Sequence, residues 1–169
     1  MKNSSYRFFF AAAIVTTAIL LITIWQGSGE NQILRKIGAV LLISTPVIWI
    51  LTVVAFKKFG RVQQGKAYYE SDVLVTSGIF GFLRHPQYFA YIILTIGFTQ
   101  INQTLISVVL SIIAIILFYL HCIEEEKIMT EKFPIDYPLY CKQIPRFNII
   151  VSLYKNIFPK NKKSVTGKE

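Results

Sequence analysis

The sequence predicts an all-α integral membrane protein of about four transmembrane helices, two of which form a helix-turn-helix hairpin. Three observations support this prediction. Hydrophobic residues make up 53% of the 169 residues and charged residues only 16%, which is too apolar for an ordinary soluble domain. Long uncharged stretches can cross a hydrocarbon core of roughly 30 Å as helices. The basic residues gather outside these stretches.

The first two spans are predicted from their length and their lack of charge. A third apolar stretch, from Tyr88 to Ile123, is about twice as long as one span needs to be. The polar residues from Gln100 to Thr104 interrupt it and suit a tight turn, so we predict two antiparallel helices there. The predicted spans are residues 8–25, 37–56, 86–100 and 105–123, within a single domain of residues 1–169.

The net charge of +9 is better explained by membrane topology than by nucleic-acid binding. Basic residues lie in the loop before the hairpin and in the segment after it, whereas the hairpin turn has no charge. By the positive-inside bias, we expect the loop and both termini to face the cytoplasm. Part of the basic tail, residues 160–169, is expected to rest on anionic lipid. The sequence therefore predicts a lipid bilayer as partner and no nucleic acid, and it leaves the oligomeric state open.

The N-terminal apolar stretch could also be a secretory signal, because Lys2 and Arg7 precede it. It is longer than a usual signal core and lacks a clear cleavage site, so we expect a retained span. The two cysteines, Cys122 and Cys141, fall on the predicted cytoplasmic side, where no disulfide is expected.

A short polar motif, Arg84-His85-Pro86-Gln87-Tyr88, stands where the charged loop meets the hairpin. Pro86 suits the first turn of a helix, where its missing amide costs nothing. This places Arg84 and His85 at a helix N-terminus, where backbone amides and the helix dipole favour an anionic group. Just upstream, residues 73–78 indicate a short extended piece that ends in a turn at Gly78.

A second polar group, Glu124-Glu125-Glu126, follows the hairpin. An antiparallel hairpin returns both of its ends to the same membrane surface. His121 and Glu125 are four residues apart and share one helical face, and the helix is expected to continue to Lys132. We therefore expect five side chains to lie close together around one small volume: Arg84, His85, Tyr88, His121 and Glu125.

Each of these motifs has a simpler interpretation. The basic pair could be membrane anchors, and the tyrosines could be residues of an interfacial belt. Glu124 and Glu126 are expected to form a solvated helix extension paired with Lys127 and Lys132. A metal site is not predicted, because the sequence around His121 contains neither an HExxH nor a paired ExxH pattern.

Two segments carry a resemblance to a known family. LVTSGIFGFLRHPQYFA, followed later by HCIEEEKIMTEKFPIDYPLYCKQIPRF, resembles the membrane isoprenylcysteine carboxyl methyltransferase family and its phospholipid methyltransferase relatives. Their pattern is RHPxYxG, a helix, and then RxxxEExxLxxxFGxxYxxYxxxVPR. The resemblance covers residues 64–147, half the chain, and the combination of motifs is fairly specific. The earlier spans are similar only in hydropathy.

The resemblance implies S-adenosyl-L-methionine as methyl donor, bound in a cytoplasmic cofactor pocket over the hairpin. It also implies a lipophilic acceptor substrate that reaches this pocket from the bilayer. By the same resemblance, the cofactor contacts would come from the matching positions Gln64, Asp72, Val73, Leu74, Val75, Phe80, His85, Pro86, Gln87, Tyr88 and Glu125.

Three positions depart from the family pattern: His121 replaces an arginine, and Ala90 and Pro134 replace glycines. In the prenylcysteine enzymes that arginine contributes to the acceptor site, and a neutral imidazole would hold a carboxylate less well. The acceptor is therefore left open between a prenylcysteine carboxylate, a phospholipid amine, a lipid phenol and a small thiol.

The chemistry of the motif residues agrees with methyl transfer. Displacement at a sulfonium needs alignment of donor and acceptor and exclusion of water. Glu125 and nearby tyrosine rings can stabilise a sulfonium, and Arg84 can bind the carboxylate of the donor. An amine or phenol acceptor needs a base, for which His121 and Glu125 are candidates. We therefore predict catalytic roles for Arg84, His121 and Glu125.

The sequence leaves two other classes of protein as alternatives. A sterol-type reductase that uses NADPH would share a related C-terminal architecture, but the sequence has no glycine-rich phosphate loop. A non-enzymatic scaffold or small transporter is the other alternative. Charged residues within the spans would have favoured transport, and none occur.

Overall fold

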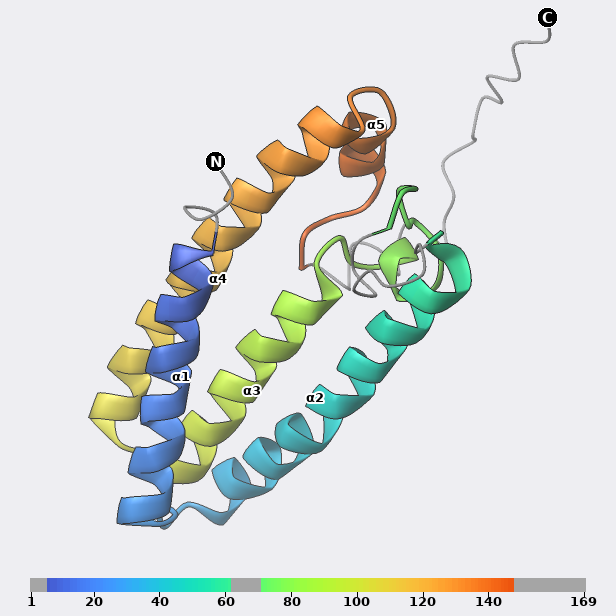
Figure 1. The fold of residues 1–169 in the computed structure, drawn as a ribbon. Helices are drawn as coiled ribbons and strands as arrows, with labels where there is room; N and C mark the ends of the chain where they lie inside the picture. The colour runs from blue at the N-terminus through green and yellow to red at the C-terminus, as the bar shows by residue number, and fades with distance from the viewer. Residues whose placement is uncertain (1–5, 62–70, 148–169) are drawn as a thin grey trace, which may run out of the picture.

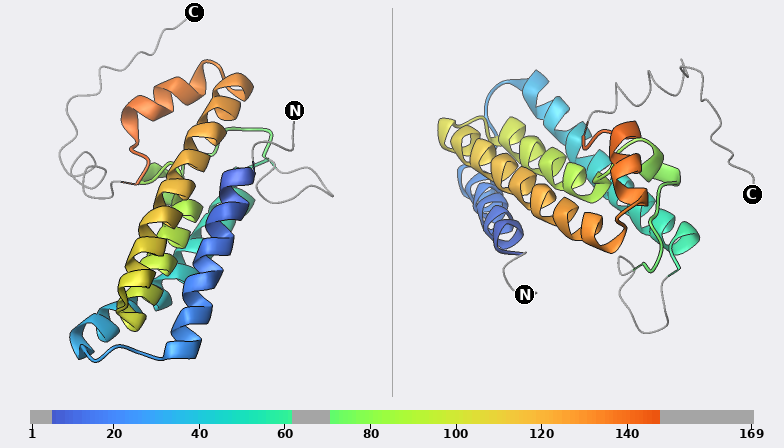
Figure 2. Two further views of the ribbon diagram at one scale, coloured as in Figure 1. Left: turned by 90° about the vertical axis from the view of Figure 1, so that its left-hand side faces the viewer. Right: turned by 90° about the horizontal axis from the view of Figure 1, so that it is seen from above.

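The computed structural model describes residues 6–61 and 71–147 (Figure 1). This part of the chain contains helices and no β-strand, which confirms the all-α fold class. The four long helices lie side by side as a bundle, with a short helical turn and a short helix at one end (Figures 1 and 2). The elements are α1 (Arg7–Gln26), α2 (Gln32–Phe59), η1 (Gly78–Gly81), α3 (Pro86–Asn102), α4 (Leu105–Lys132) and α5 (Asp136–Gln143).

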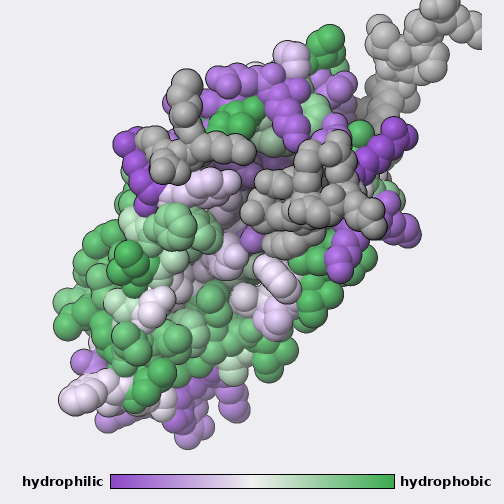
Figure 3. All heavy atoms as spheres, viewed as in Figure 1, coloured by the Kyte–Doolittle hydropathy of each residue, from purple (hydrophilic) through white to green (hydrophobic). Residues whose placement is uncertain are grey.

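Three helices, α1, α2 and α4, are long and apolar enough to cross a membrane. Large side chains such as Ile14, Ile43 and Trp25 are at least 70% exposed on them, which fits contact with lipid. Figure 3 shows hydrophobic side chains around the middle of the bundle and hydrophilic ones at its two ends. The chain is an integral membrane protein.

The remaining predicted span, α3, is the central helix of the bundle. It has 17 residues and is therefore about 25 Å long, shorter than a hydrocarbon core of roughly 30 Å. It packs against α1, α2 and α4. Its buried positions include small or polar residues such as Ala90, Thr95 and Gly97, which let the neighbouring helices approach closely.

Local signals set the ends of the helices. Asn31 caps α2 by accepting hydrogen bonds from two amides of its first turn, so α2 begins before the predicted residue 37. His85 is the N-cap of α3 and Pro86 occupies its first turn, as predicted. Thr104 caps α4 in the same way as Asn31 caps α2. Helix α4 continues to Lys132, as expected.

The hairpin turn is held to the α1–α2 loop by Gln103. Gln103 has a left-handed backbone with φ 61° and ends α3, which confirms the predicted turn. The Asn31 amide donates to Gln103 Oε1 at 3.0 Å, and Gln103 Nε2 donates to the Asn31 carbonyl at 2.8 Å. The Gly29 amide also donates to the Ile101 carbonyl at 2.9 Å. The two loops are therefore joined at this end of the bundle.

Helices α2 and α3 touch at two glycines. A methyl group added to Gly38 would lie 2.8 Å from the Gly97 carbonyl oxygen and 2.8 Å from Ile101 Cγ1. A methyl group added to Gly97 would lie 2.8 Å from Leu42 Cδ2. The backbones approach so closely here that neither position has room for a side chain.

We expect Gly38→Ala to lower the melting temperature in detergent. Alanine favours an isolated helix over glycine by about 1 kcal/mol, but overpacking against a backbone carbonyl costs typically 1–3 kcal/mol. Ala39→Val is the control, since Ala39 is exposed on the same helix. A melting temperature equal to or above the wild-type value in Gly38→Ala would show that the contact is not tight.

Candidate functional site

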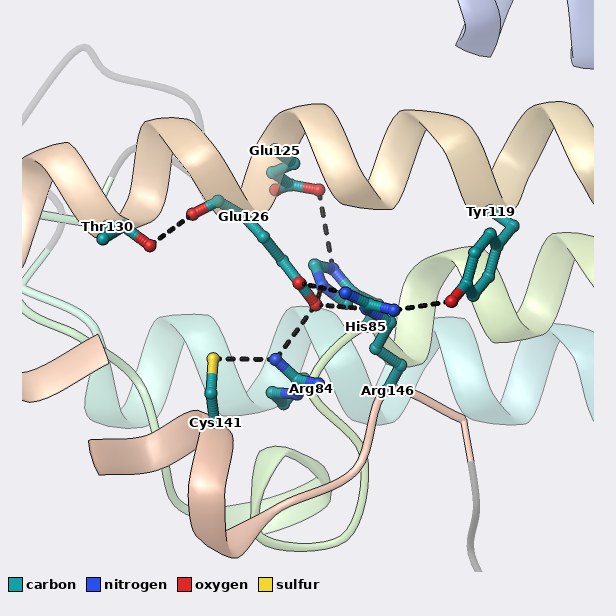
Figure 4. Close-up of polar contacts among 8 residues, drawn as sticks. All are labelled: Arg84, His85, Tyr119, Glu125, Glu126, Thr130, Cys141 and Arg146. Atoms are coloured by element: carbon teal, nitrogen blue, oxygen red, sulfur yellow. Dashed lines mark hydrogen bonds and ion pairs between the residues drawn. The ribbon is translucent and has the colours of Figure 1, made fainter. Parts of the chain in front are cut away.

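Polar side chains from three segments meet where α3 begins and where α4 leaves the apolar bundle (Figure 4). His85, only 6% exposed, lies between two carboxylates of α4. Its Nδ1 is 3.6 Å from Glu125 Oε2, and its Nε2 is 3.2 Å from Glu126 Oε1. We refer to Arg84, His85, Glu125, Glu126 and Arg146 as the ionic cluster.

Glu126 is the centre of the ionic cluster. Arg146 donates to both of its oxygens, from Nε to Oε1 and from Nη2 to Oε2, each at 2.7 Å. Arg84 Nη1 lies 3.0 Å from Oε1, and the Glu126 side chain is 14% exposed. One carboxylate thus meets two guanidinium groups and an imidazole, a strong charge-assisted arrangement.

The prediction that Glu124 and Glu126 pair with lysines of the helix extension was wrong. Glu126 pairs within the ionic cluster, and Glu124 pairs with Arg7 of α1 at 3.1 Å. Lys132 donates instead to the carbonyl of Ser71 at 2.6 Å. Each contact crosses between segments, so the partners are set by how the helices pack.

The segment after α4 folds back to bring Arg146 to the site. Helix α5, which the sequence did not predict, places Tyr140 so that its hydroxyl donates to the Phe80 carbonyl at 2.6 Å. The Arg84 amide donates to the Pro145 carbonyl at 3.1 Å. Arg146 Nη1 also donates to Tyr119 of α4 at 2.6 Å. Arg146 was not among the predicted site residues, although the Pro-Arg pair that ends the motif was a signal for it.

Charges within the ionic cluster shift the pKa values of its members. These residues lie beyond the apolar part of α4, which ends at Ile123. Burial disfavours the charged form of His85, but Glu125 and Glu126 outweigh it and raise its pKa above 6.5. Burial would raise the pKa of Glu126, yet His85, Arg146 and Arg84 lower it to about 2. For Glu125, His85 likewise overcomes burial and lowers the pKa below 4.5. The cluster therefore holds ionised carboxylates beside a readily protonated imidazole.

Two buried polar atoms of the cluster have no hydrogen-bond partner: Glu125 Oε2 and Arg84 Nε. The Glu125 side chain as a whole is 38% exposed, but this oxygen is shielded from solvent. It faces His85 Nδ1 at 3.6 Å, which is beyond hydrogen-bond distance. One negative and one positive group thus keep a spare hydrogen-bonding position, which suits a ligand that carries both charges.

A second polar pair, Tyr88 and His121, lies one helical turn deeper than the ionic cluster. The hydroxyl of Tyr88 and Nε2 of His121 are 3.0 Å apart, and His121 is 2% exposed. The rings of Tyr6 and Phe9 lie against His121, with centroids 5.9 and 5.7 Å away. The structure therefore brings the predicted residues of both hairpin ends into one continuous set of contacts.

The predicted residues of the preceding loop lie apart from this set. Val75 and Phe80 are buried against Ala55 of α2, and the Tyr140 hydrogen bond to the Phe80 carbonyl links Phe80 to α5. Asp72 is exposed, and its amide donates to the Arg61 carbonyl at 3.3 Å. The others are placed as follows: Val73 and Leu74 are half-buried in the loop, Pro86 is buried, Gln87 donates to the Tyr91 hydroxyl, and Gln64 lies outside the described residues.

Within residues 6–61 and 71–147, no group of three His, Cys, Asp or Glu side chains is arranged to hold a metal ion. Both cysteines are free thiols. Cys122 is buried in α4, and Cys141 contacts the guanidinium of Arg84.

We expect Glu126→Gln to lower stability strongly. The amide keeps the shape of the side chain but leaves Arg84 and Arg146 without their carboxylate. Removing one member of a buried ion pair costs about 3–5 kcal/mol, and the partial exposure of Glu126 reduces this to roughly 2–3 kcal/mol. Thermal unfolding in detergent measures the loss. Glu131→Gln, at an exposed position of the same helix, is the control, and equal melting temperatures for the two variants would refute a central role for Glu126.

The raised pKa of His85 predicts a pH-dependent stability. Its protonated form stabilises the fold in full below about pH 6.5, and this contribution is lost as the pH rises through the raised pKa. Glu126 acts oppositely, because its contribution is present above about pH 4.5 and is lost as the pH falls toward 2. We expect the melting-temperature gap between wild type and His85→Asn to shrink as the pH rises above about 6.5. A gap that stays the same as the pH rises would contradict the ion pairing.

Comparison with known proteins gives one match. The model of a family described as phospholipid methyltransferase matches residues 33–135, which include Arg84, His85, Tyr88, His121 and the three glutamates. No curated protein and no solved structure matches the chain. The phospholipid methyltransferase part of the resemblance is confirmed, and α1 and Arg146 lie outside the matched range. Because the match covers more than half of the chain, this membrane protein belongs to the phospholipid methyltransferase family.

Proposed function

We propose that the chain transfers a methyl group from S-adenosyl-L-methionine to the head group of a membrane lipid, at the end of the bundle where the ionic cluster lies. The family supplies the reaction class, methyl transfer in a membrane. The observation that supports this location is His85, held between Glu125 and Glu126 at the N-terminus of α3. No other described group of side chains combines charge, burial and a helix start in this way.

The residues present fit the cofactor. S-adenosyl-L-methionine carries a carboxylate, an ammonium and a sulfonium, so its site needs both signs of charge. The buried Oε2 of Glu125 can accept from or lie beside a cationic group, and Arg84 Nε can donate to a carboxylate. The first amides of α3 have no partner within the helix and favour an anionic group.

When bound, the cofactor supplies a methyl group on a positively charged sulfur. The residues of the chain then have two tasks, which are to align the acceptor with that methyl group and to keep water away. The aromatic side chains around Tyr88 and His121 exclude water from the deeper side of the site. Glu125 contributes a negative charge that is fixed in position before the reaction.

The position of the site relative to the membrane supports a lipid acceptor. The ionic cluster lies directly beyond the apolar part of α4, so the head group of a lipid could meet it without leaving the bilayer. By the positive-inside bias this end faces the cytoplasm. A prenylcysteine carboxylate, a phospholipid amine and a lipid phenol are the candidate acceptors, and family membership favours methyl transfer over the reductase and scaffold alternatives.

We expect the wild-type protein in detergent to bind S-adenosyl-L-methionine, and Glu125→Gln to bind it roughly 10–100-fold more weakly. A hydrogen bond to a charged group contributes about 1.5–3 kcal/mol, and each 1.4 kcal/mol is tenfold in affinity. Isothermal titration calorimetry measures the affinity, with Glu131→Gln as the matched control on the same helix.

Transfer of a labelled methyl group to a lipid extract, with the product identified by mass, then tests the reaction. His85→Ala should reduce both binding and transfer. The proposal fails if the wild type does not bind the cofactor, or if Glu125→Gln binds it as tightly as Glu131→Gln does.

A further inference from the structure

Both ring nitrogens of His85 face carboxylates of α4. Nδ1 lies 3.6 Å from Glu125 Oε2, and Nε2 lies 3.2 Å from Glu126 Oε1. The imidazole is only 6% exposed, and the rings of Tyr88 and Phe147 lie beside it, with centroids 5.9 and 6.3 Å away. A cationic ligand that pairs with the buried oxygen of Glu125 therefore competes with His85 for the same carboxylate.

The proton of His85 depends on these two carboxylates. Burial lowers the pKa of His85, but Glu125 and Glu126 together outweigh burial and raise it above 6.5. A positive charge brought beside Glu125 would weaken this stabilisation and repel the imidazolium directly. His85 therefore holds its proton less firmly when a cation lies in the ionic cluster.

The net charge of the ionic cluster decides which ligands have this effect. With His85 protonated, the cluster has three positive groups against two carboxylates, which leaves one positive charge overall. The nearby Glu124 is paired with Arg7, and this pair adds no net charge. When His85 loses its proton, the cluster becomes neutral.

The other titratable groups around the cluster do not reduce its positive charge. Tyr88 of α3 and Tyr137 of α5 are uncharged phenols near neutral pH, and burial together with Glu126 raises the pKa of Tyr137 further. Cys141 is a free thiol that accepts from Arg84 Nη1 at 2.7 Å. The ring of His121 lies against Tyr88, with centroids 5.1 Å apart, and a proton on His121 would only add positive charge.

The methyl donor and the product that remains after methyl transfer differ by one positive charge. S-adenosyl-L-methionine carries a carboxylate, an ammonium and a sulfonium, so it is positive overall. S-adenosyl-L-homocysteine has a neutral thioether in place of the sulfonium and carries no net charge. A positive ligand is repelled by a partly buried cluster that is itself positive, and this repulsion is relieved when His85 becomes neutral. The product meets no such repulsion.

We propose that His85 distinguishes the methyl donor from the product, because it gives up its proton to water when the donor binds and keeps its proton when the product binds. The words donor and product rest on the proposed function. The Glu125 side chain is 38% exposed, so water reaches the carboxylate beside His85 and takes up the proton. Since a proton is released more readily at higher pH, a rise in pH strengthens donor binding relative to product binding.

Calorimetry counts the released protons without a methyl acceptor. Each ligand is titrated into the protein in detergent at about pH 6.5, in buffers that differ in ionisation enthalpy, and the change in observed enthalpy gives the number of protons. This pH lies below the α-amino pKa of about 7.7–8.0, so the ammonium of both ligands stays protonated. The variants are His85→Asn, which cannot titrate, and His121→Gln, which removes the other of the two histidines.

We expect S-adenosyl-L-methionine to release several-fold more protons than S-adenosyl-L-homocysteine from the wild type and from His121→Gln. In His85→Asn this difference should be lost. Equal proton release by the two ligands in the wild type would overturn the proposal. A difference that disappears in His121→Gln would assign the proton to His121 and would overturn it as well.

The pH dependence of affinity in the wild type is a second test that needs no variant. The ratio of the product Kd to the donor Kd should rise with pH by at most about tenfold per pH unit, which is the limit for one proton. It should level off above the raised pKa of His85, where no proton is left to release. A ratio that stays constant as the pH rises would refute the role of His85 while leaving the proposed function intact. If the wild type binds neither ligand, the proposed function fails and this inference fails with it.

Discussion

The carboxylate of Glu126 is the interaction on which the arrangement of the site depends. It meets Arg84 and His85 before α3 and Arg146 after α5, so three segments far apart in sequence converge on one side chain of α4. At the edge of an apolar bundle the effective dielectric constant is low, and an unpaired guanidinium there is costly. The position of His85, and with it the start of α3, is therefore fixed by the same ion pairs that hold the C-terminal segment in place.

The neighbouring residues Glu125 and Glu126 differ in how fully their carboxylates are paired. Successive residues of an α-helix point about 100° apart, so Glu125 and Glu126 leave α4 in different directions. Glu126 is turned toward the two arginines and is fully engaged, whereas Glu125 keeps a buried oxygen without a hydrogen bond. His85 reaches both, one through each ring nitrogen. A fully paired carboxylate and one with an unpaired oxygen thus lie at adjacent positions, and His85 couples them electrostatically.

The sequence predicted what depends on local pattern and missed what depends on tertiary contact. Long apolar runs located the bundle helices, Pro86 located the start of α3, and the polar run near Gln103 located the hairpin turn. The partners of Glu126 were not predicted, because Arg146 reaches it only after α5 folds back. Helical spacing already argues against Lys127 and Lys132 as partners of Glu126, because residues one or six positions apart do not face each other on a helix.

The hydrogen bonds between Gln103 and Asn31 have a consequence for how the protein enters the membrane. They join the loop between α1 and α2 to the turn of the α3–α4 hairpin, and Asn31 is exposed at the end of the bundle. Before α3 and α4 insert, water can satisfy the same backbone groups of Asn31, so the loop between α1 and α2 has no buried polar atom without a partner. Helices α1 and α2 can therefore insert before α3 and α4, and the hydrogen bonds between Asn31 and Gln103 form afterwards.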